Sequence, residues 1–215
     1  MIKAIVFDFD GVIVRNSEFT KESAWSDIFP RKYEIEILKA RQKFAGGKGS
    51  RLEIIRELAP LFNISEEKVD GWVNKKAEEY ARITSTATMQ EGILIEDFIA
   101  LKKLSVKYPL YLNSATPETV LPEIVKKLSI EPFFKAVYGW RNPNSKLENL
   151  KQVLNDEGIS SENILFVGDA DSDFKIAAKF GCSFVGVMND WNKWKKDNRD
   201  FNLISGIKDL LDYCP

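Results

Sequence analysis

Short runs of apolar residues recur along the chain, and helical patterns lie between most of them. The runs have the length and composition of buried parallel strands, because they are apolar almost throughout. Strands that alternate with helices in this way predict an open α/β sheet. The expected strands are Ile2–Phe9, Leu110–Asn113, Ala136–Tyr138, Ile164–Val167 and Phe184–Met188.

The region from about residue 16 to residue 88 follows a different pattern. Amphipathic segments succeed one another there without a convincing strand, as in SRLEIIRELAPLF and EEKVDGWVNKKAEEYARI. We therefore expect two domains, an α/β core of residues 1–15 and 89–215 and an inserted helical domain of residues 16–88. Trp25 and Trp72 fall in the amphipathic segments and are expected in the core of the helical domain.

Cap signals predict where the helices of the core domain begin. Thr116 can cap a helix whose first residue is Pro117. Ser145 and Glu148 have the spacing of a capping box. Asp171 is a candidate cap for the helix that follows the fourth strand.

The charge balance argues against several classes of partner. The 215 residues include 31 basic and 32 acidic side chains, so a net charge of -1 creates no field that would attract nucleic acid or an anionic membrane. The segment DWNKWKKDNRD mixes aromatic and basic residues, but its acidic residues cancel the charge. A solvated surface segment is favoured over a site for single-stranded nucleic acid. We expect no nucleic-acid or membrane partner, and a monomer is the default.

Cysteine and histidine usage narrows the chemistry further. Cys182 and Cys214 are the only two cysteines, too few for a disulfide framework or a zinc site, so a reducing cytoplasm is the expected location. The apolar N-terminal stretch is interrupted by Asp8 and has no cleavage motif, which indicates neither a signal peptide nor a membrane span. Because the chain has no histidine, proton transfer must fall to Asp, Glu, Lys, Tyr or Cys.

The first strand carries two carboxylates, Asp8 and Asp10, in the sequence DFD. Alternate residues of a strand point to the same face, so the pattern predicts that both carboxylates leave the sheet on one side. Two like charges about 4 Å apart repel by roughly 4 kcal/mol at the effective dielectric of a protein surface. The pair therefore needs a compensating charge.

Other polar residues follow later strands, at the carboxyl ends where an open parallel sheet binds its ligands. Four carboxylates at one place would cost much of a domain's stability of about 5–15 kcal/mol, unless a dication such as Mg²⁺ binds there. That ion, with a lysine and a hydroxyl, forms a site suited to a phosphoryl group. Asp8 can then attack phosphorus, and Asp10 can act as acid and base. The residues at or beyond the later strand ends are Ser114, Lys146, Asp169 and Asp173.

Four motifs, in this order, resemble those of the haloacid dehalogenase-like (HAD) hydrolase superfamily. They are DFDGVI, NSATP, the lysine in SKLENL, and GDADSD. The glycine in QEGILIEDFIALKKL is similar to the point where such chains re-enter the core from a helical cap. By this resemblance the sequence is identified as a member of the helical-capped phosphatase subgroup, similar to phosphoglycolate phosphatases and β-phosphoglucomutases. The resemblance implies a Rossmann-like parallel sheet core with an inserted helical cap domain.

The resemblance also implies a role for each motif residue. Asp8 would be the nucleophile and a Mg²⁺ ligand, and Asp10 the acid and base whose backbone carbonyl also reaches the metal. Asp169 would bind the metal directly and Asp173 indirectly or through water, while Asp171 would only cap its helix. The residues that would bind the phosphoryl group are Ser114, Ala115 and Lys146.

One position departs from the pattern of the superfamily. Related sequences commonly have proline after the motif lysine, whereas Leu147 follows Lys146 here. Arg141, five residues before that lysine, is therefore a rival for the cationic role. We favour Lys146, because the expected capping box holds it at a fixed place.

A glycine-rich stretch in the helical domain, FAGGKGSRLEII, is a candidate contact with the substrate. Ser50 and Glu53 have capping-box spacing, which places Lys48 at a helix N-terminus, where anions bind. The resemblance implies that this loop closes over the core site and contacts the substrate through Lys48 or Arg51. A flexible connector is the alternative, and a nucleotide P-loop is disfavoured because Gly49 follows the lysine.

These observations predict a Mg²⁺-dependent phosphatase that hydrolyses a small phosphorylated metabolite through an aspartyl phosphate. A phosphomutase of the β-phosphoglucomutase type, which passes the phosphoryl group to a second hydroxyl, is the nearest alternative. A non-catalytic phospho-acceptor domain is the alternative from another class, although it would need neither the insertion nor Asp10. Phosphonate cleavage and dehalogenation are disfavoured, because related enzymes with those activities lack the second aspartate.

Overall fold

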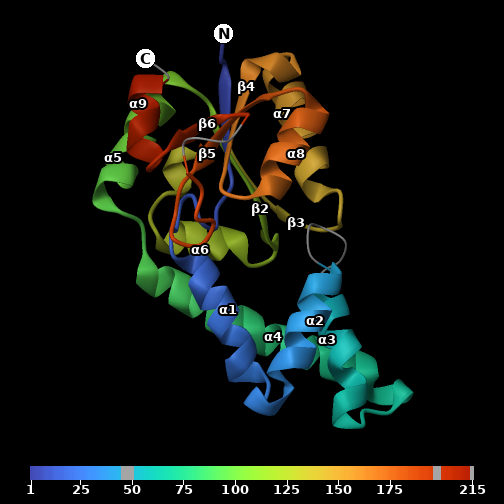
Figure 1. The fold of residues 1–215 in the computed structure, drawn as a ribbon. Helices are drawn as coiled ribbons and strands as arrows, with labels where there is room; N and C mark the ends of the chain where they lie inside the picture. Colours follow the sequence, from blue (N-terminus) through green and yellow to red (C-terminus); the bar gives the residue numbers. More distant parts are fainter. Residues whose placement is uncertain (45–50, 196–199, 214–215) are drawn as a thin grey trace. The chain divides into compact units, whose positions relative to one another are not determined.

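A computed structural model of the chain describes residues 1–44, 51–195 and 200–213 (Figure 1). The chain divides into two compact units. We call residues 1–18 together with 88–215 the core unit, and residues 19–87 the helical unit. Because α1 (Ser17–Ile28) and α4 (Glu66–Glu91) cross the two boundaries, both connections between the units run inside helices.

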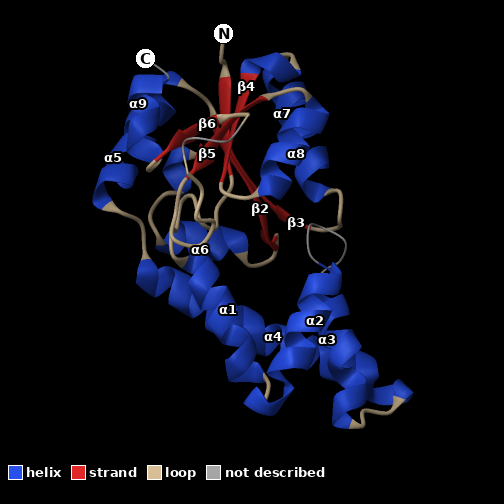
Figure 2. Cartoon of the chain, viewed as in Figure 1, coloured by secondary structure: helices blue, strands red, loops and turns tan. Residues whose placement is uncertain are grey.

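The core unit is built on one sheet of six strands, drawn in red in Figure 2. Neighbouring strands all pair in parallel, in the order β3-β2-β1-β4-β5-β6, so the first strand of the chain is an inner strand. This arrangement confirms the expected α/β fold with a parallel sheet. The strands are β1 (Ala4–Phe7), β2 (Leu110–Pro117), β3 (Ala136–Trp140), β4 (Ile164–Gly168), β5 (Ser183–Val187) and β6 (Asn202–Ile204).

Helices cover both faces of this sheet (Figure 2). The side chains of β1 alternate between the two faces: Ile5 and Phe7 share a buried cluster with Leu101 of α5, whereas Val6 shares a second cluster with Leu150 of α7. Each fully buried side chain of this kind contributes roughly 1.5–3 kcal/mol. The helices are α5 (Ile95–Lys107), α6 (Leu121–Lys127) and α9 (Leu210–Tyr213) on the first face and α7 (Ser145–Glu157) and α8 (Asp171–Phe180) on the second, with 3₁₀ turns at Glu131–Phe133, Ser161–Asn163 and Ile207–Asp209.

The first strand ends earlier than the sequence predicts. It ends at Phe7 instead of Phe9, because two backbone N–H groups further along the chain donate to the Phe9 carbonyl at 2.8 and 3.1 Å and turn the chain back. Gly11 permits this turn, since its φ of +74° is one that other residues rarely adopt. Asp8 and Asp10 therefore both follow β1, so the expectation that they lie within one strand is wrong, although both carboxylates are buried.

The second strand, in contrast, runs further than predicted. It continues to Pro117, which pairs with Trp140 of β3 after a shift in register. The backbone N–H of Glu118 then donates to the Trp140 carbonyl at 3.2 Å. The next helix begins only at Leu121, so the prediction of a helix that starts at Pro117 with Thr116 as its cap is wrong.

The predicted caps of α7 and α8 are displaced by one residue. The N-cap of α7 is Asn144 and that of α8 is Ala170, so Ser145 and Asp171 are the first residues inside their helices. The Ser145 hydroxyl accepts hydrogen bonds of 2.8 Å from the backbone N–H groups of Arg141 and the residue after it. The expected capping box is therefore wrong, because this hydroxyl orders the preceding loop instead.

Two features near the end of the chain were not predicted. β6 has only three residues, of which Ile204 alone is buried, so no apolar run indicates it. Trp194 is 8% exposed and packs against Phe201, whereas Trp191 is 39% exposed. The segment expected to be solvated therefore contributes one of its two tryptophans to the core.

Among its described residues, the helical unit consists of helices and 3₁₀ turns around one buried cluster. Trp25 is 5% exposed and contacts the rings of Phe29 and Tyr80, with centroids 6.3 and 4.7 Å away, and Trp72 packs against the same cluster. Both tryptophans thus lie where the sequence predicts. No described helix combines the length and apolar composition that crossing a membrane requires. The remaining elements are α2 (Glu34–Phe44), α3 (Arg51–Leu58) and 3₁₀ turns at Arg31–Tyr33 and Ala59–Phe62.

Candidate active site

The parallel register brings the ends of the inner strands to one edge of the sheet. Phe7 of β1 pairs with Leu112 of β2 on one side and with Val167 of β4 on the other. Asp8 directly follows β1, and Asp169 directly follows β4. The two carboxylates are distant in sequence and adjacent in the fold because their strands are neighbours.

Three buried carboxylates meet at this edge. Asp8, Asp169 and Asp173 each offer one oxygen, and these oxygens all lie within 4.8 Å of one another. Asp173 comes from the first turn of α8, where the Ala170 backbone N–H donates to its Oδ2 at 3.3 Å. The Phe9 backbone N–H donates to Asp8 Oδ1 at 2.8 Å. Local backbone geometry therefore orients two of the three groups.

Lys146, in the first turn of α7, is the cation beside these carboxylates. Its Nζ lies 2.9 Å from Asp8 Oδ2 and 2.6 Å from Asp173 Oδ1. Burial works against the charge of this ammonium, but the two carboxylates more than offset that effect and raise the pKa of Lys146. Arg141 instead pairs with Glu118 at 2.6 Å. The structure thus places Lys146, and not its rival, next to Asp8.

Among the residues that the structure describes, carboxylates outnumber cations at this site. Burial raises the pKa of the Asp8 carboxyl well above its ordinary value, and the Lys146 ammonium opposes only part of this rise. The neighbouring carboxylates of Asp173, Asp169 and Asp10 add to the rise. These four aspartates and the Lys146 ammonium form a predominantly acidic site within the described part of the chain, and carboxylate oxygens are the hard donors that Mg²⁺ prefers. The residues present therefore fit a divalent cation.

Asp10 and Ser114 are joined by a residue that the sequence analysis had given another role. The Thr116 hydroxyl donates to Asp10 Oδ2 at 2.9 Å, and the Thr116 backbone N–H donates to Ser114 Oγ at 2.9 Å. Both Asp10 and Ser114 are buried, whereas the side chain of Ala115, between Ser114 and Thr116, is exposed. The extension of β2 beyond its predicted end is what brings Thr116 to Asp10.

Asn189 is a second residue of the site that the sequence analysis missed. Its Nδ2 donates to Asp169 Oδ2 at 2.8 Å and to the Gly11 carbonyl at 3.1 Å. Nearby, Asn192 Nδ2 donates to the backbone carbonyl of Asp169 at 2.9 Å. Asn189 stands just beyond β5, so inspection of this fifth strand end, as of the others, would have found it.

Gly11 is required by close approach as well as by its φ. A Cβ at this position would lie 1.9 Å from Asp169 Oδ2. Any side chain here would therefore displace the Asp169 carboxylate from the cluster.

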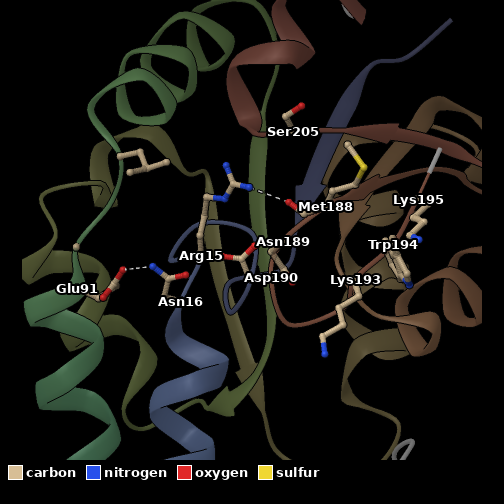
Figure 3. Close-up of a pocket in the computed structure, with 12 residues that line it drawn as sticks. Arg15, Asn16, Glu91, Met188, Asn189, Asp190, Lys193, Trp194, Lys195 and Ser205 are labelled. Carbon is tan, nitrogen blue, oxygen red and sulfur yellow. Dashed lines mark hydrogen bonds between the residues drawn. The ribbon is translucent and has the colours of Figure 1, made fainter.

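A cavity of about 800 Å³ lies in the core unit next to Asn189 (Figure 3). Its walls come from the segment after β1, the segment after α4 and the loop after β5. Arg15 NH2 donates to the Met188 carbonyl at 2.7 Å, and Asn16 Nδ2 donates to Glu91 Oε1 at 2.6 Å, both drawn as dashed lines in Figure 3. The first bond ties the segment before α1 to the loop after β5, and the second joins that segment to the end of α4.

The helical unit contains two predicted substrate contacts, Lys48 and Arg51. Lys48, with Ser50 and the glycines around it, lies outside the described residues. The Arg51 guanidinium lies over the ring of Tyr80, 4.3 Å from its centroid. Arg51 thus has an aromatic contact within its own unit, and its role toward a substrate stays a prediction.

Comparison with known proteins identifies the family. The family model described as haloacid dehalogenase-like hydrolase matches residues 5–187, a range that includes all four motifs of the site. The chain belongs to the haloacid dehalogenase-like hydrolases. The resemblance noted in the sequence is therefore confirmed.

Relatives and solved structures of this family resemble the chain along nearly its whole length. A phosphoglycolate phosphatase of Photorhabdus laumondii is 24% identical and aligns over 98% of this chain and 91% of its own length. The β-phosphoglucomutase of Clostridium difficile is 20% identical, with a TM-score of 0.67, over 99% and 95% of the two chains. The HAD-hydrolase YfnB of Bacillus subtilis is 17% identical, with a TM-score of 0.69, over 99% and 98%. The family and the phosphatases among these relatives support the expected enzyme class, a phosphatase.

Proposed function

We propose that this chain is a Mg²⁺-dependent phosphatase that hydrolyses a small phosphorylated metabolite through an aspartyl phosphate. The observation that carries the proposal is the buried group of three carboxylates with Lys146 bound to two of them. Such a group combines a nucleophile with positive charge for a phosphoryl group. The phosphoglycolate phosphatases among the relatives favour a phosphate monoester as the substrate.

The steps of this reaction are divided among the residues of the site. A carboxylate oxygen of Asp8 attacks phosphorus, and the bond from phosphorus to the substrate oxygen breaks. Asp10, oriented by Thr116, gives its proton to the leaving alcohol and later takes a proton from the water that hydrolyses the aspartyl phosphate. Lys146 and Ser114 bind the phosphoryl oxygens, Ser114 together with the adjacent Ala115 backbone.

Asp8 and Asp169 would hold the Mg²⁺ ion, with the Asp10 carbonyl as a further ligand and Asp173 bound directly or through water. When bound, the ion supplies positive charge to the phosphoryl oxygens. Asn189 keeps the Asp169 carboxylate turned into the site. The YfnB structure, which is described as bound to magnesium, supports the choice of metal.

The substrate is proposed as a class. Phosphoglycolate is the first compound to test because of the relatives, and sugar phosphates are the second because of the β-phosphoglucomutase among the structural neighbours. We propose that residues 16–88 form a cap domain whose Lys48 or Arg51 contacts the part of the substrate beyond the phosphate. This division of labour would leave bond cleavage to the core and substrate choice to the cap.

The test is phosphate release from a panel of phosphorylated metabolites, with Mg²⁺ and with EDTA. We expect Mg²⁺-dependent release that Asp8→Asn abolishes, since the amide is a poor nucleophile. Asp171→Asn is the matched control, because Asp171 is an exposed aspartate of the same acidic motif and should leave the rate unchanged. Full activity of Asp8→Asn would exclude the proposed nucleophile. An isomerised sugar phosphate in place of free phosphate would indicate a phosphomutase.

A further inference from the structure

Two asparagines are fully buried where the sheet meets α7. Asn113 is 0% exposed and precedes Ser114 on β2, and Asn149 is 1% exposed and lies one helical turn after Lys146 on α7. A buried amide destabilises a fold unless its hydrogen bonds are made. The two residues that precede Asn113 on β2, Tyr111 and Leu112, are buried apolar or aromatic residues of the kind that suits an inner strand. The hydrogen-bond partners of these two buried amides therefore have to be identified.

Their hydrogen bonds form one chain from the surface to the backbone of Lys146. Arg141 NH2 donates to Asn149 Oδ1 at 2.7 Å, and Asn149 Nδ2 donates to Asn113 Oδ1 at 2.9 Å. Asn113 Nδ2 then donates to the Lys146 carbonyl at 2.8 Å. Because a guanidinium can only donate and a carbonyl can only accept, the two ends of the chain fix the orientation of both amides.

The last bond in this chain is made where α7 has no cap of its own. The N-cap residue, Asn144, makes no side-chain hydrogen bond to the helix. Asn113 does not cap the helix, because it donates to a carbonyl, but it ties the first turn of the helix to β2, next to Ser114. From this turn the Lys146 side chain reaches Asp8 and Asp173. Lysine carries about 2 kcal/mol of rotamer entropy, so its placement depends on how firmly its backbone is held.

We propose that Asn113 and Asn149 are positioning residues, which hold the Lys146 backbone so that its ammonium stands at the phosphoryl site. This inference rests on the proposed phosphatase function. The two amides do not touch the substrate. They set the distance between Lys146 on α7 and Ser114 on β2, the two groups proposed to bind the phosphoryl oxygens.

The main test replaces both amides with leucine, as N113L/N149L. Removing both partners of a buried hydrogen bond in favour of apolar groups of similar shape can be nearly neutral for stability. We expect the double variant to fold and its kcat/KM to fall by about 10- to 100-fold, because misplacing a catalytic group by about 1 Å costs up to about a hundredfold. N149D is the second variant. Its carboxylate still pairs with Arg141 but cannot donate to Asn113, so the same direction of change is expected.

Tyr111→Phe is the matched control. The Tyr111 hydroxyl donates to Glu157 at the far end of α7, so this bond also ties β2 to α7, but away from Lys146. If the link between strand and helix were merely structural, Tyr111→Phe and the asparagine variants would behave alike. We expect Tyr111→Phe to lower the melting temperature and to leave kcat/KM within about twofold.

Inhibition by orthovanadate supplies a measurement that does not depend on the fraction of folded enzyme. Vanadate takes up the five-coordinate geometry of phosphoryl transfer, so its inhibition constant should rise about 10-fold or more in N113L/N149L and N149D and stay unchanged in Tyr111→Phe. Suppose that the wild type is active and that the asparagine variants fold. If these variants then keep the wild-type kcat/KM and vanadate inhibition constant, this inference is overturned and the proposed function is not. Failure of both variants to fold would also overturn this inference, because it would assign the two asparagines a structural role. A wild type that releases no phosphate from any substrate would overturn the proposed function and this inference together.

Discussion

Replacing Lys146 with methionine removes the ammonium that neutralises part of the buried acidic cluster. The side chains of Lys146, Asp8 and Asp173 are 15%, 10% and 0% exposed, so water screens these charges little. Methionine keeps nearly the same length and leaves the carboxylates with an unpaired excess of negative charge.

The expected loss of stability follows from that burial. Breaking a buried ion pair by removing one partner costs about 3–5 kcal/mol. Uptake of a proton by Asp8, whose pKa is already raised by burial, brings the cost to the lower end. For a chain of this size 1 kcal/mol corresponds to about 2–4 °C, so the unfolding midpoint of the core should fall by about 6–12 °C.

The assay is differential scanning calorimetry in EDTA and in excess Mg²⁺. Lys208→Met is the control, because Lys208 and its partner Glu96 are 48% and 54% exposed, so water screens this pair and it adds little to stability. Mg²⁺ at about 100 times its dissociation constant stabilises by about 2.7 kcal/mol, and should raise the midpoint of Lys146→Met at least as much as that of the wild type. If the midpoint of Lys146→Met in EDTA lies within about 2 °C of that of Lys208→Met, the argument from charge excess is refuted.

Three further predictions test other parts of the molecule. Gly11→Ala should weaken Mg²⁺ activation by at least about tenfold, because the new Cβ would lie 1.9 Å from Asp169 Oδ2. The measurement is the Mg²⁺ dependence of phosphate release, and an unchanged dependence would contradict the close approach. Burial raises the pKa of the Cys182 thiol to about 12. In a Cys214→Ser background at pH 8, alkylation of Cys182 should therefore be roughly a thousandfold slower than that of an ordinary thiol, and it should become fast on unfolding. Rapid labelling of the folded protein would count against this burial. Ile55→Ala, at a fully buried position, should destabilise the helical unit by about 2–5 kcal/mol in urea titration, whereas the same change at the exposed Ile35 should cost less than about 0.5 kcal/mol.

The sheet and its acidic edge were predictable from the sequence for a simple reason. A buried parallel strand must be apolar along its whole length, so polar residues that interrupt or follow it stand out. This pattern indicates Asp8, Asp10, Asp169 and Ser114 from the sequence alone. Their meeting at one edge then follows from the rule that parallel strands end on the same side.

Strand ends and caps were less predictable, because they depend on contacts with distant residues. β1 ends two residues early because the chain turns back on the Phe9 carbonyl, and β2 runs to Pro117 because Trp140 pairs with it. The hydrophobic pattern does not predict β6, because Ile204 is its one buried residue. Trp194 lies in a polar, charged segment and is buried only because Phe201 packs against it.

The sequence by itself determined which residues could carry the chemistry: carboxylates, a hydroxyl and a lysine at strand ends, with no histidine to compete. Only the tertiary structure decided which polar groups contact one another. In the fold, Lys146 rather than Arg141 lies beside Asp8. Thr116 donates a hydrogen bond to Asp10, and Asn189 donates one to Asp169. The physical reason is that hydrophobic patterning is written along the chain, whereas the partner of a polar group is set by distances across the fold.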